Sequence, residues 1–375
     1  MKPIQLALAL TGLAAAGLVT AGLARPAHAA EPVVAWQGAR SAVTVDQLRP
    51  TMGSGEGYGE KYTFNADFGE RGSLYYSLTV SNLGFGDHKM EAKGRLTLDG
   101  EKYTWKKQLD DDDWSFSKSG EFKISAGPAT LSGTPDHLVL EALSGKNALK
   151  FDFKAIAQPW RPRNGQVQFG SDRKKSDYTV FPLMTVSGTV FADGKLQTVE
   201  GKGHGTHSWT ELALYDQARW SMEFRGVDLG DDTTLYIREL GLHRDYGAGR
   251  VAYLLVTRGK EILVESFDYQ LTPTDVMTDG EHENRYQVPE SFTLLGNDAE
   301  APQARQFRGK ITKKKLLRRK DLLSTMNAAV RMVVSKVSKP VTYQYDSEYL
   351  LEVRIDGQVQ RLQGVGRYEM THFNK

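Results

Sequence analysis

The sequence predicts an all-β protein that contains two similar halves in tandem, with an export signal before them and one basic helix near the C-terminus. Short segments rich in Tyr, Val, Phe, Leu and Thr alternate with turn residues from Tyr62 onward, and two sequence markers each recur at nearly the same offset. The chain has 375 residues. Because a single hydrophobic core rarely grows to that size, two domains are expected.

The N-terminus has the order of a secretion signal. Lys2 is followed by an apolar run from Ile4 to Ala24 and then by the small-residue site Ala27-His28-Ala29. We expect residues 1–29 to be a signal peptide that is cleaved after Ala29, and we expect the mature protein in a bacterial periplasm. The alternative is an uncleaved anchor, because the apolar run is long enough to span a bilayer. The chain contains no cysteine, so an oxidising compartment would bring it no disulfides.

Antiparallel strands joined by short hairpins are the expected building blocks of both halves. The segments Leu74–Val80, Glu91–Leu98 and Tyr103–Gln108 follow one another, and the turn pair Asp99-Gly100 separates the last two. Similar spacing continues as far as the segment Glu261–Tyr269. The pattern is typical of a sheet that turns back on itself every eight to twelve residues or so.

A unit of roughly 160 residues is expected to occur twice. Leu235-Tyr236 repeats Leu74-Tyr75 at an offset of 161 residues (235 minus 74). A Gly-x-Gly strand at residues 201–203 recurs at residues 364–366, an offset of 163 (364 minus 201). This length suits a small up-and-down β-barrel that can enclose one apolar ligand, which places the two domains at residues 30–210 and 211–375. The alternative is that the two offsets agree by coincidence, because hairpin patterns of this kind are common.

Charge is distributed unevenly along the chain. The net charge of +2 comes from 48 basic and 46 acidic residues, but residues 305–339 hold twelve Lys or Arg and one acid, a net of +11 (12 minus 1). Such local asymmetry points to an anionic partner at one place and argues against a nucleic-acid binder, which would be basic more generally.

Residues 312–339 have the only convincing helical periodicity, which predicts a basic amphipathic helix that ends before Pro340. Positive charge at a helix N-terminus opposes the helix dipole, so the basic residues there need another explanation. They would contact an anionic membrane surface or, alternatively, lie in solvent while the helix packs on a barrel. The candidate membrane-contact residues are Lys313, Lys314, Lys315, Arg318, Arg319 and Lys320.

Several short motifs resemble one known family. They are Pro159-Trp160-Arg161-Pro162, Phe181-Pro182 ahead of Val186-Ser187-Gly188-Thr189-Val190, and the stretch from Gly201 to Trp209. In this order they resemble the tandem lipocalin-like proteins that include the carotenoid 1,2-hydratases and the yeast survival-factor proteins. The stretch from Tyr62 to Gly69 is similar to the start of that family's first domain. The resemblance implies two lipocalin-like antiparallel β-barrels and a site for a hydrophobic ligand.

The glycine-rich motif departs from the family pattern in a way that affects the expected chemistry. Thr206 stands where the family has Asp before the histidine, and a threonine cannot protonate an alkene. Glu211 and Glu223 lie nearby in sequence as substitute acids. The candidate catalytic residues are therefore His207, Glu211 and Tyr178, with no spacing that selects among them.

Large aromatic side chains and the two neighbouring histidines are the candidate ligand-binding residues. They either line a pocket or plug the ends of the barrels. A zinc site shared by the histidines is disfavoured, because alternate side chains of a strand point to opposite faces and no third ligand is evident. We expect no metal and no cofactor. The set is Trp160, Tyr178, His204, His207, Trp209 and Trp220.

The leading functional hypothesis is a periplasmic protein that binds or transfers a lipid or a terpenoid. Burying an alkyl chain contributes about 0.8 kcal/mol per methylene, so such a protein needs few polar contacts. The alternative is a terpenoid-modifying enzyme (a hydratase, cyclase or isomerase) that uses an acid near the Gly201–Trp209 motif.

Overall fold

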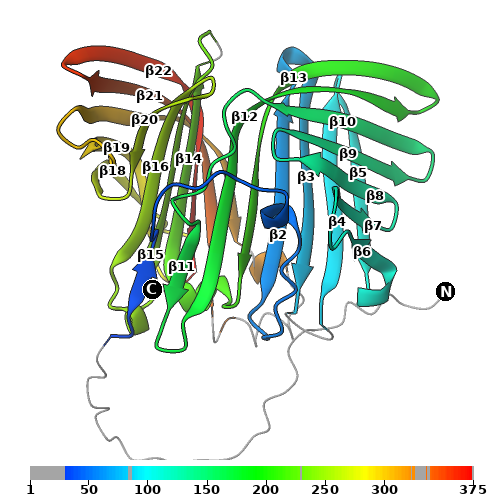
Figure 1. The fold of residues 1–375 in the computed structure, drawn as a ribbon, viewed down its shortest axis with the longest axis horizontal. Helices are drawn as coiled ribbons and strands as arrows, with labels where there is room; N and C mark the ends of the chain where they lie inside the picture. The colour runs from blue at the N-terminus through cyan, green and yellow to red at the C-terminus, as the bar shows by residue number, and fades with distance from the viewer. Residues whose placement is uncertain are drawn as a thin grey trace, which may run out of the picture.

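The computed structural model describes residues 30–82, 87–228, 230–321, 323–325, 335 and 338–373, and in this part of the chain it is almost entirely β-sheet. Two antiparallel sheets stand next to each other, and their middle strands meet in the centre of the molecule (Figure 1). We call β1–β13 the first half and β14–β22 the second half. The first sheet is a nearly closed barrel, whereas the second is a half-barrel.

The first half contains thirteen strands in the order β5-β4-β3-β2-β13-β12-β10-β9-β8-β7-β6, with β11 paired to β12 and β1 paired to β11. Short 3₁₀ turns occur at Asp46–Leu48, Gly69–Arg71 and Asp111–Asp113. The strands are β1 Val33–Ala35, β2 Gly59–Asp67, β3 Gly72–Ser81, β4 Lys89–Leu98, β5 Glu101–Leu109, β6 Trp114–Phe116, β7 Phe122–Ala126, β8 Ala129–Thr134, β9 His137–Ser144, β10 Asn147–Ala155, β11 Gln166–Phe169, β12 Lys174–Ala192 and β13 Lys195–Thr210.

The second half contains nine strands in the order β17-β16-β15-β14-β22-β21-β20-β19-β18. A one-turn helix, α1 Leu214–Gln217, precedes it, and 3₁₀ turns occur at Arg244–Tyr246 and Leu323–Thr325. The strands are β14 Ala218–Asp228, β15 Thr233–Leu242, β16 Arg250–Arg258, β17 Glu261–Ser266, β18 Tyr269–Thr278, β19 Gln287–Asn297, β20 Arg305–Asp321, β21 Val341–Ile355 and β22 Gln358–His372. The expected boundary after Thr210 falls between β13 and β14.

The predicted duplication is confirmed by the topology. In each half the first long strand pairs with the last one, so β2 lies beside β13 and β14 lies beside β22. On one side of this pair the next strands follow in chain order, β3-β4-β5 in the first half and β15-β16-β17 in the second. On the other side they follow in reverse chain order, β12-β10-β9 and β21-β20-β19. The Gly-x-Gly markers occupy matching places, because Gly203 is opposite Ala66 and Gly366 is opposite Gly226.

The glycines of these markers make room for aromatic rings. A Cβ at Gly201 would lie 2.0 Å from the Asp67 carbonyl and 3.0 Å from the ring of Phe68, and one at Gly366 would lie 2.6 Å from the ring of Phe224. Real Cβ atoms rarely approach other groups so closely. The repeated motif therefore reflects the packing of a core phenylalanine against the backbone of the neighbouring strand.

Buried side chains occupy the interior of each half. In the first half, Phe64 and Phe153 pack with ring centroids 5.2 Å apart, and both are 2% exposed or less. In the second half, Tyr345 and Tyr368 stack at 5.7 Å and are both fully buried. Alternation along each strand places these residues inward and leaves the polar ones outward.

The prediction of a basic helix over residues 312–339 is wrong for its first ten residues. Residues 312–321 continue strand β20, which pairs with β19 and β21. Irregular pairing between Lys313 and Lys315, and again between Leu316 and Arg318, breaks the strict alternation, which is why the sequence shows no period of two there. Of the remainder, only residues 323–325, 335 and 338–339 are described, and the rest lies outside the described residues.

Acidic side chains neutralise part of the basic run. Lys313 pairs with Glu290, Lys314 pairs with Glu348 at 2.7 Å, and Arg319 pairs with Asp279 at 2.8 Å. Lys315, Arg318 and Lys320 form no ion pair with the residues that the structure describes. Within the described ranges, no helix has the length and apolar character needed to cross a bilayer.

Candidate functional site

Aromatic side chains from both halves meet where the two sheets touch. We call this set the junction cluster: Trp36, Trp160, Tyr178, Tyr236, Tyr253 and Phe267. Tyr253 on β16 lies at its centre, with ring centroids 5.3 Å from Trp160, 5.5 Å from Trp36 and 5.8 Å from Tyr236. These separations are typical of favourable aromatic pairs. The cluster therefore joins the halves with apolar surface that neither half could bury alone.

The side chains at the junction project from the outer faces of the strands, away from the two barrel interiors. Glu265 is opposite Leu255 of β16, and the neighbouring Val264 points into the second core. Tyr178 is opposite Ser208 of β13 and faces the second half, where Arg238 lies over its ring at 5.0 Å. Strand alternation thus turns one face of β12, β15, β16 and β17 toward the junction.

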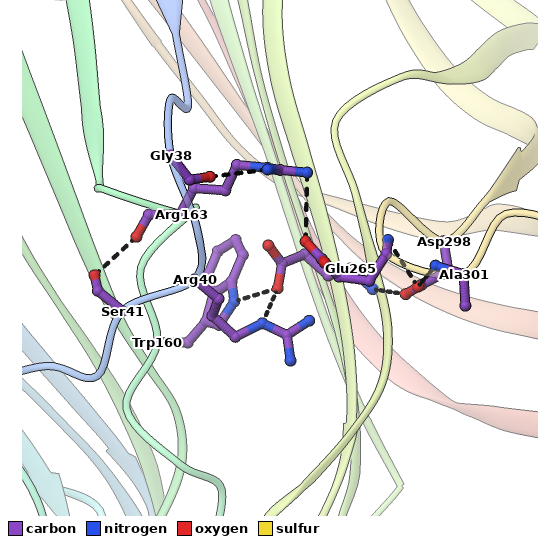
Figure 2. Close-up of polar contacts among 9 residues, drawn as sticks. Gly38, Arg40, Ser41, Trp160, Arg163, Glu265, Asp298 and Ala301 are labelled. Carbon is purple, nitrogen blue, oxygen red and sulfur yellow. Dashed lines mark hydrogen bonds and ion pairs between the residues drawn. The ribbon is translucent and has the colours of Figure 1, made fainter.

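Glu265 is a fully buried acid beside the cluster (Figure 2). Its Oε2 accepts hydrogen bonds from the Trp160 indole at 3.2 Å and from Arg40 Nε at 2.5 Å. Its Oε1 is buried and has no hydrogen-bond partner. Burial raises the pKa of the Glu265 carboxyl, and Arg40 and the Trp160 hydrogen bond offset part of that rise.

A set of polar contacts fixes the segments around Glu265. Asp298 accepts the backbone N–H of Glu265 at 2.9 Å and also that of Ala301 at 2.8 Å. Arg163 donates to the Gly38 carbonyl at 2.8 Å and pairs with Glu300 at 3.4 Å (Figure 2). Two chain segments of the first half are thereby held against two of the second, which positions the carboxyl rigidly.

A second acid, Glu223, lies on the other side of the cluster. It pairs with Arg225, accepts a hydrogen bond from Arg238 at 3.0 Å, and accepts one from the Tyr236 hydroxyl at 2.9 Å. Burial alone would raise the pKa of Glu223, but the two guanidinium groups and the Tyr236 hydroxyl lower it below its ordinary value. Glu223 is therefore held as a carboxylate, whereas burial favours the protonated form of Glu265.

The interior of the first half has its own buried acid, which is fully engaged. Glu60 accepts hydrogen bonds from the Thr51 backbone at 2.8 Å, from Tyr58 and from Tyr62 at 2.9 Å, and its Oε1 lies 2.6 Å from His207 Nε2. The His207 ring stacks on Tyr62 at 4.1 Å. Because both of its oxygens are engaged, the Glu60 carboxyl serves to hold the barrel together.

Two depressions open on the outer surfaces, away from the junction. One, of about 520 Å³, lies over β18–β21 of the second half and is lined by Leu295, Leu350 and Arg308, among others. The other, of about 260 Å³, lies beside Trp105 and Leu143 of the first half. Neither is lined by a buried ionisable group, so both are weaker candidates than the junction.

The structure brings two of the sequence-predicted ligand residues together. Trp160 and Tyr178 both belong to the junction cluster and are 2% and 6% exposed. Trp209 packs against the first core, and Trp220 packs against the second core. Neither belongs to the junction cluster.

The two histidines point to opposite faces of β13, as strand alternation predicts. His207 points into the first core, whereas His204 faces the second half. The polar partner of His207 is Glu60, whose Oε1 lies 2.6 Å from the His207 Nε2. Within the described ranges, no three His, Asp or Glu side chains gather as a metal site would require.

The candidate catalytic residues are not brought together. Tyr178 faces the junction and His207 faces the interior of the first half. Glu211 Oε2 accepts the backbone N–H of Lys175 at 2.7 Å, which occupies it in a turn at the end of the sheet. The buried acid at the junction, Glu265, was not singled out from the sequence. An acid directly after the apolar run Ile262-Leu263-Val264 is a signal that could have found it.

These features define a tandem lipocalin-like β protein whose halves meet at a buried aromatic junction. The chain belongs to the Svf1 family, whose model matches residues 63–374. No protein of curated function matches the sequence.

Solved structures share the fold. A protein from Nitrosomonas europaea, proposed as an AttH, is 15% identical, with a TM-score of 0.52 over 86% of this chain and 94% of its own. CghA, solved with Sch210972, is 9% identical, with a TM-score of 0.55 over 85% of this chain and 89% of its own. At these identities the likeness concerns the fold alone.

Proposed function

We propose that this protein binds a hydrophobic ligand, a lipid or a terpenoid, at the junction between its two halves. The observation that carries the proposal is the Glu265 carboxyl, whose buried Oε1 has no partner beside six aromatic rings. Small-molecule sites typically combine an apolar wall with a few convergent polar groups. A ligand with an apolar body and one hydrogen-bond donor, such as a long-chain or isoprenoid alcohol, would fit this combination.

The packing of the two barrel interiors favours the junction as the place of the ligand site. Buried side chains fill both cores, and the acid inside the first half is already saturated with hydrogen bonds. At the junction, by contrast, Phe267 is partly exposed and the Arg40 side chain is 35% exposed. A ligand approaching from solvent would meet these two side chains first.

Stoichiometric binding of a fluorescent fatty alcohol to the mature protein tests the proposal. Phe267→Leu should weaken binding about threefold, because it removes part of the apolar contact area. Phe191→Leu is the matched control, since Phe191 is 41% exposed on β12 and lies outside the junction cluster. Lipid extraction and mass spectrometry of protein from its native host would identify the ligand. No saturable binding, or equal weakening by both variants, would contradict a site at the junction.

A second candidate function is a terpenoid-modifying enzyme, and the raised pKa of Glu265 favours it. Burial raises the pKa of the Glu265 carboxyl, and a raised pKa makes a carboxyl better suited to act as a general acid toward an apolar substrate. In that case Glu265→Gln should abolish turnover of an isoprenoid substrate far more than it weakens binding. Equal losses of turnover and binding would favour the carrier.

We also propose that the protein acts in a bacterial periplasm and associates with anionic membrane. Export predicts a mature chain that begins at Ala30, which the intact mass of the secreted protein checks. Membrane association would use the basic residues of β20, of which Lys315, Arg318 and Lys320 have no ion pair with the described residues. Co-sedimentation with anionic vesicles should weaken as salt rises.

A further inference from the structure

Polar outer faces of the two sheets meet alongside the junction cluster. The outer face of β13 is turned toward β14 and β22 of the second half. Lys202 of β13 bonds to Asp232 of the second half at 3.1 Å, and His204 lies near Arg225 and Arg367. His204 and Arg225 are partly exposed and Arg367 is exposed, so solutes can reach all three. We call His204, Arg225 and Arg367 the seam.

The second-half face around the seam carries more cations than acids. Strand register aligns Arg318, Gln344, Glu369, Glu223 and Arg238 in one row across five strands. The adjacent row contains Lys315, Asp346, Arg367 and Arg225. Together these rows hold five cations, Lys315, Arg318, Arg225, Arg238 and Arg367, against three acids, Asp346, Glu223 and Glu369.

The arginines of this face are incompletely paired. Arg225 stands directly opposite Arg367 on the neighbouring strand, an arrangement of like charges that destabilises a sheet. Arg225 and Arg238 share the single carboxylate of Glu223, and the Nε of each is buried without a partner. The nearest acid to Arg367 is Asp346 at 3.9 Å, the limit of an ion pair.

On the same face of the first half, Asn65 is opposite His204, and the nearest acids along the sheet are Asp67, opposite Lys202, and Glu200, four residues from His204 on β13. His204 faces Arg225 and Arg367, with Glu223 and Glu369 next along the same strands. Farther along, Lys93 of the first half lies near Lys320 of the second, another like-charge contact across the halves. In agreement with this, burial and the two arginines hold the pKa of His204 well below its ordinary value.

We propose that the seam binds an anionic group, a phosphate or a carboxylate, between His204, Arg225 and Arg367. Guanidinium groups are the preferred protein partners of such groups, and an anion there would relieve the Arg225–Arg367 repulsion. The site adjoins the junction cluster at one side chain, because Arg225 lies over the ring of Tyr236 at 5.7 Å. That the anion belongs to the hydrophobic ligand rests on the proposed function, whereas binding of the anion itself does not.

Titration of the mature protein with inorganic phosphate tests the seam, with the His204 imidazole resonances as the reporter. A bound anion counters the two arginines, so phosphate should raise the pKa of His204, and the effect should fade as sodium chloride is added. The His204→Gln spectrum assigns the resonances. No change in His204 at millimolar phosphate would overturn the proposal.

Arg367→Gln and Arg361→Gln form a matched pair on β22. Their side chains are 68% and 78% exposed, so neither change should unfold the protein. Arg367→Gln should weaken phosphate binding about tenfold, as expected for the loss of a charged hydrogen bond, and Arg361→Gln should leave it unchanged. Equal effects of the two variants would mean that phosphate binds by general surface charge, which also overturns the proposal.

Decanoate and decanol distinguish binding at the seam from binding at the hydrophobic site of the proposed function. Decanoate should shift His204 as phosphate does, whereas decanol should not. Binding of either one at the junction would instead change the tryptophan fluorescence of the cluster. A His204 response with no fluorescence response would support the seam and contradict the hydrophobic site. The reverse result would contradict the seam alone.

Discussion

Replacing Glu265 by Gln removes the charge of the junction acid while keeping its shape. The amide oxygen can still accept from Trp160, so the main loss is the contact with Arg40, whose side chain is 35% exposed. Such a half-exposed ion pair contributes about 1 kcal/mol or less. Relief from burying a carboxylate offsets this loss. We therefore expect the free energy of unfolding to change by about 1 kcal/mol at most.

The pH dependence of stability gives a second measure of the same substitution. Burial raises the pKa of Glu265 in the folded protein above its value in the unfolded chain. Between those two pKa values the folded state binds more protons, so the contribution of this group is complete at low pH and is lost as pH rises through the folded pKa. Urea denaturation across this range should show that decline in the wild type, and Glu265→Gln should flatten it.

Ligand binding should respond far more strongly than stability. If the Glu265 Oε1 accepts from the ligand, its loss as a charged acceptor should weaken binding about tenfold to a hundredfold. Glu211→Gln is the control, because that carboxylate accepts the Lys175 backbone N–H away from the cluster. An unchanged dissociation constant for a fatty alcohol in Glu265→Gln, measured by tryptophan fluorescence, would refute the role given to this acid.

Three further changes test the packing of the two halves. Glu60→Ala leaves His207 and the Tyr58 hydroxyl without their acceptor in a dry interior, while the Tyr62 hydroxyl keeps the Leu48 carbonyl, so urea denaturation should show a loss of about 3–5 kcal/mol. Gly226→Ala places a Cβ 2.5 Å from the Tyr349 ring and should cost about 1–3 kcal/mol in the same assay, with an exposed turn glycine as its control. Burial lowers the pKa of His372 from 6.5 to about 4, so the unfolded chain takes up the proton first as pH falls. Stability should then drop by about 3 kcal/mol between those two values, and His372→Gln should abolish the drop.

Strand content, the duplication and the order of the halves could be predicted from the sequence, because they depend on local patterns. Alternating apolar residues and turn pairs such as Asp99-Gly100 specify hairpins within a few residues of each other, and that turn lies between β4 and β5. The Gly-x-Gly markers recur because the same ring-on-backbone packing occurs in both halves. The separation of His204 from His207 also followed from strand geometry alone.

The basic segment shows where local pattern misleads. The apolar residues at helical spacing begin with Leu316 and lie mostly beyond residue 321, yet long-range pairing of β20 with β21 holds residues 312–321 in a sheet. Two irregularities in the pairing shift the alternation and remove the period of two that would have identified the strand. Non-local hydrogen bonds therefore outweighed the local periodicity.

The sequence by itself determined what each half is: an antiparallel sheet with one apolar face and one polar face. Only the tertiary structure decided which exterior surfaces meet. Trp36, Trp160, Tyr253 and Glu265 lie on different strands and loops, up to 229 residues apart (265 minus 36), and no short-range pattern links them. Their contact depends on how two finished sheets dock, which is set by the sum of many weak contacts between distant residues.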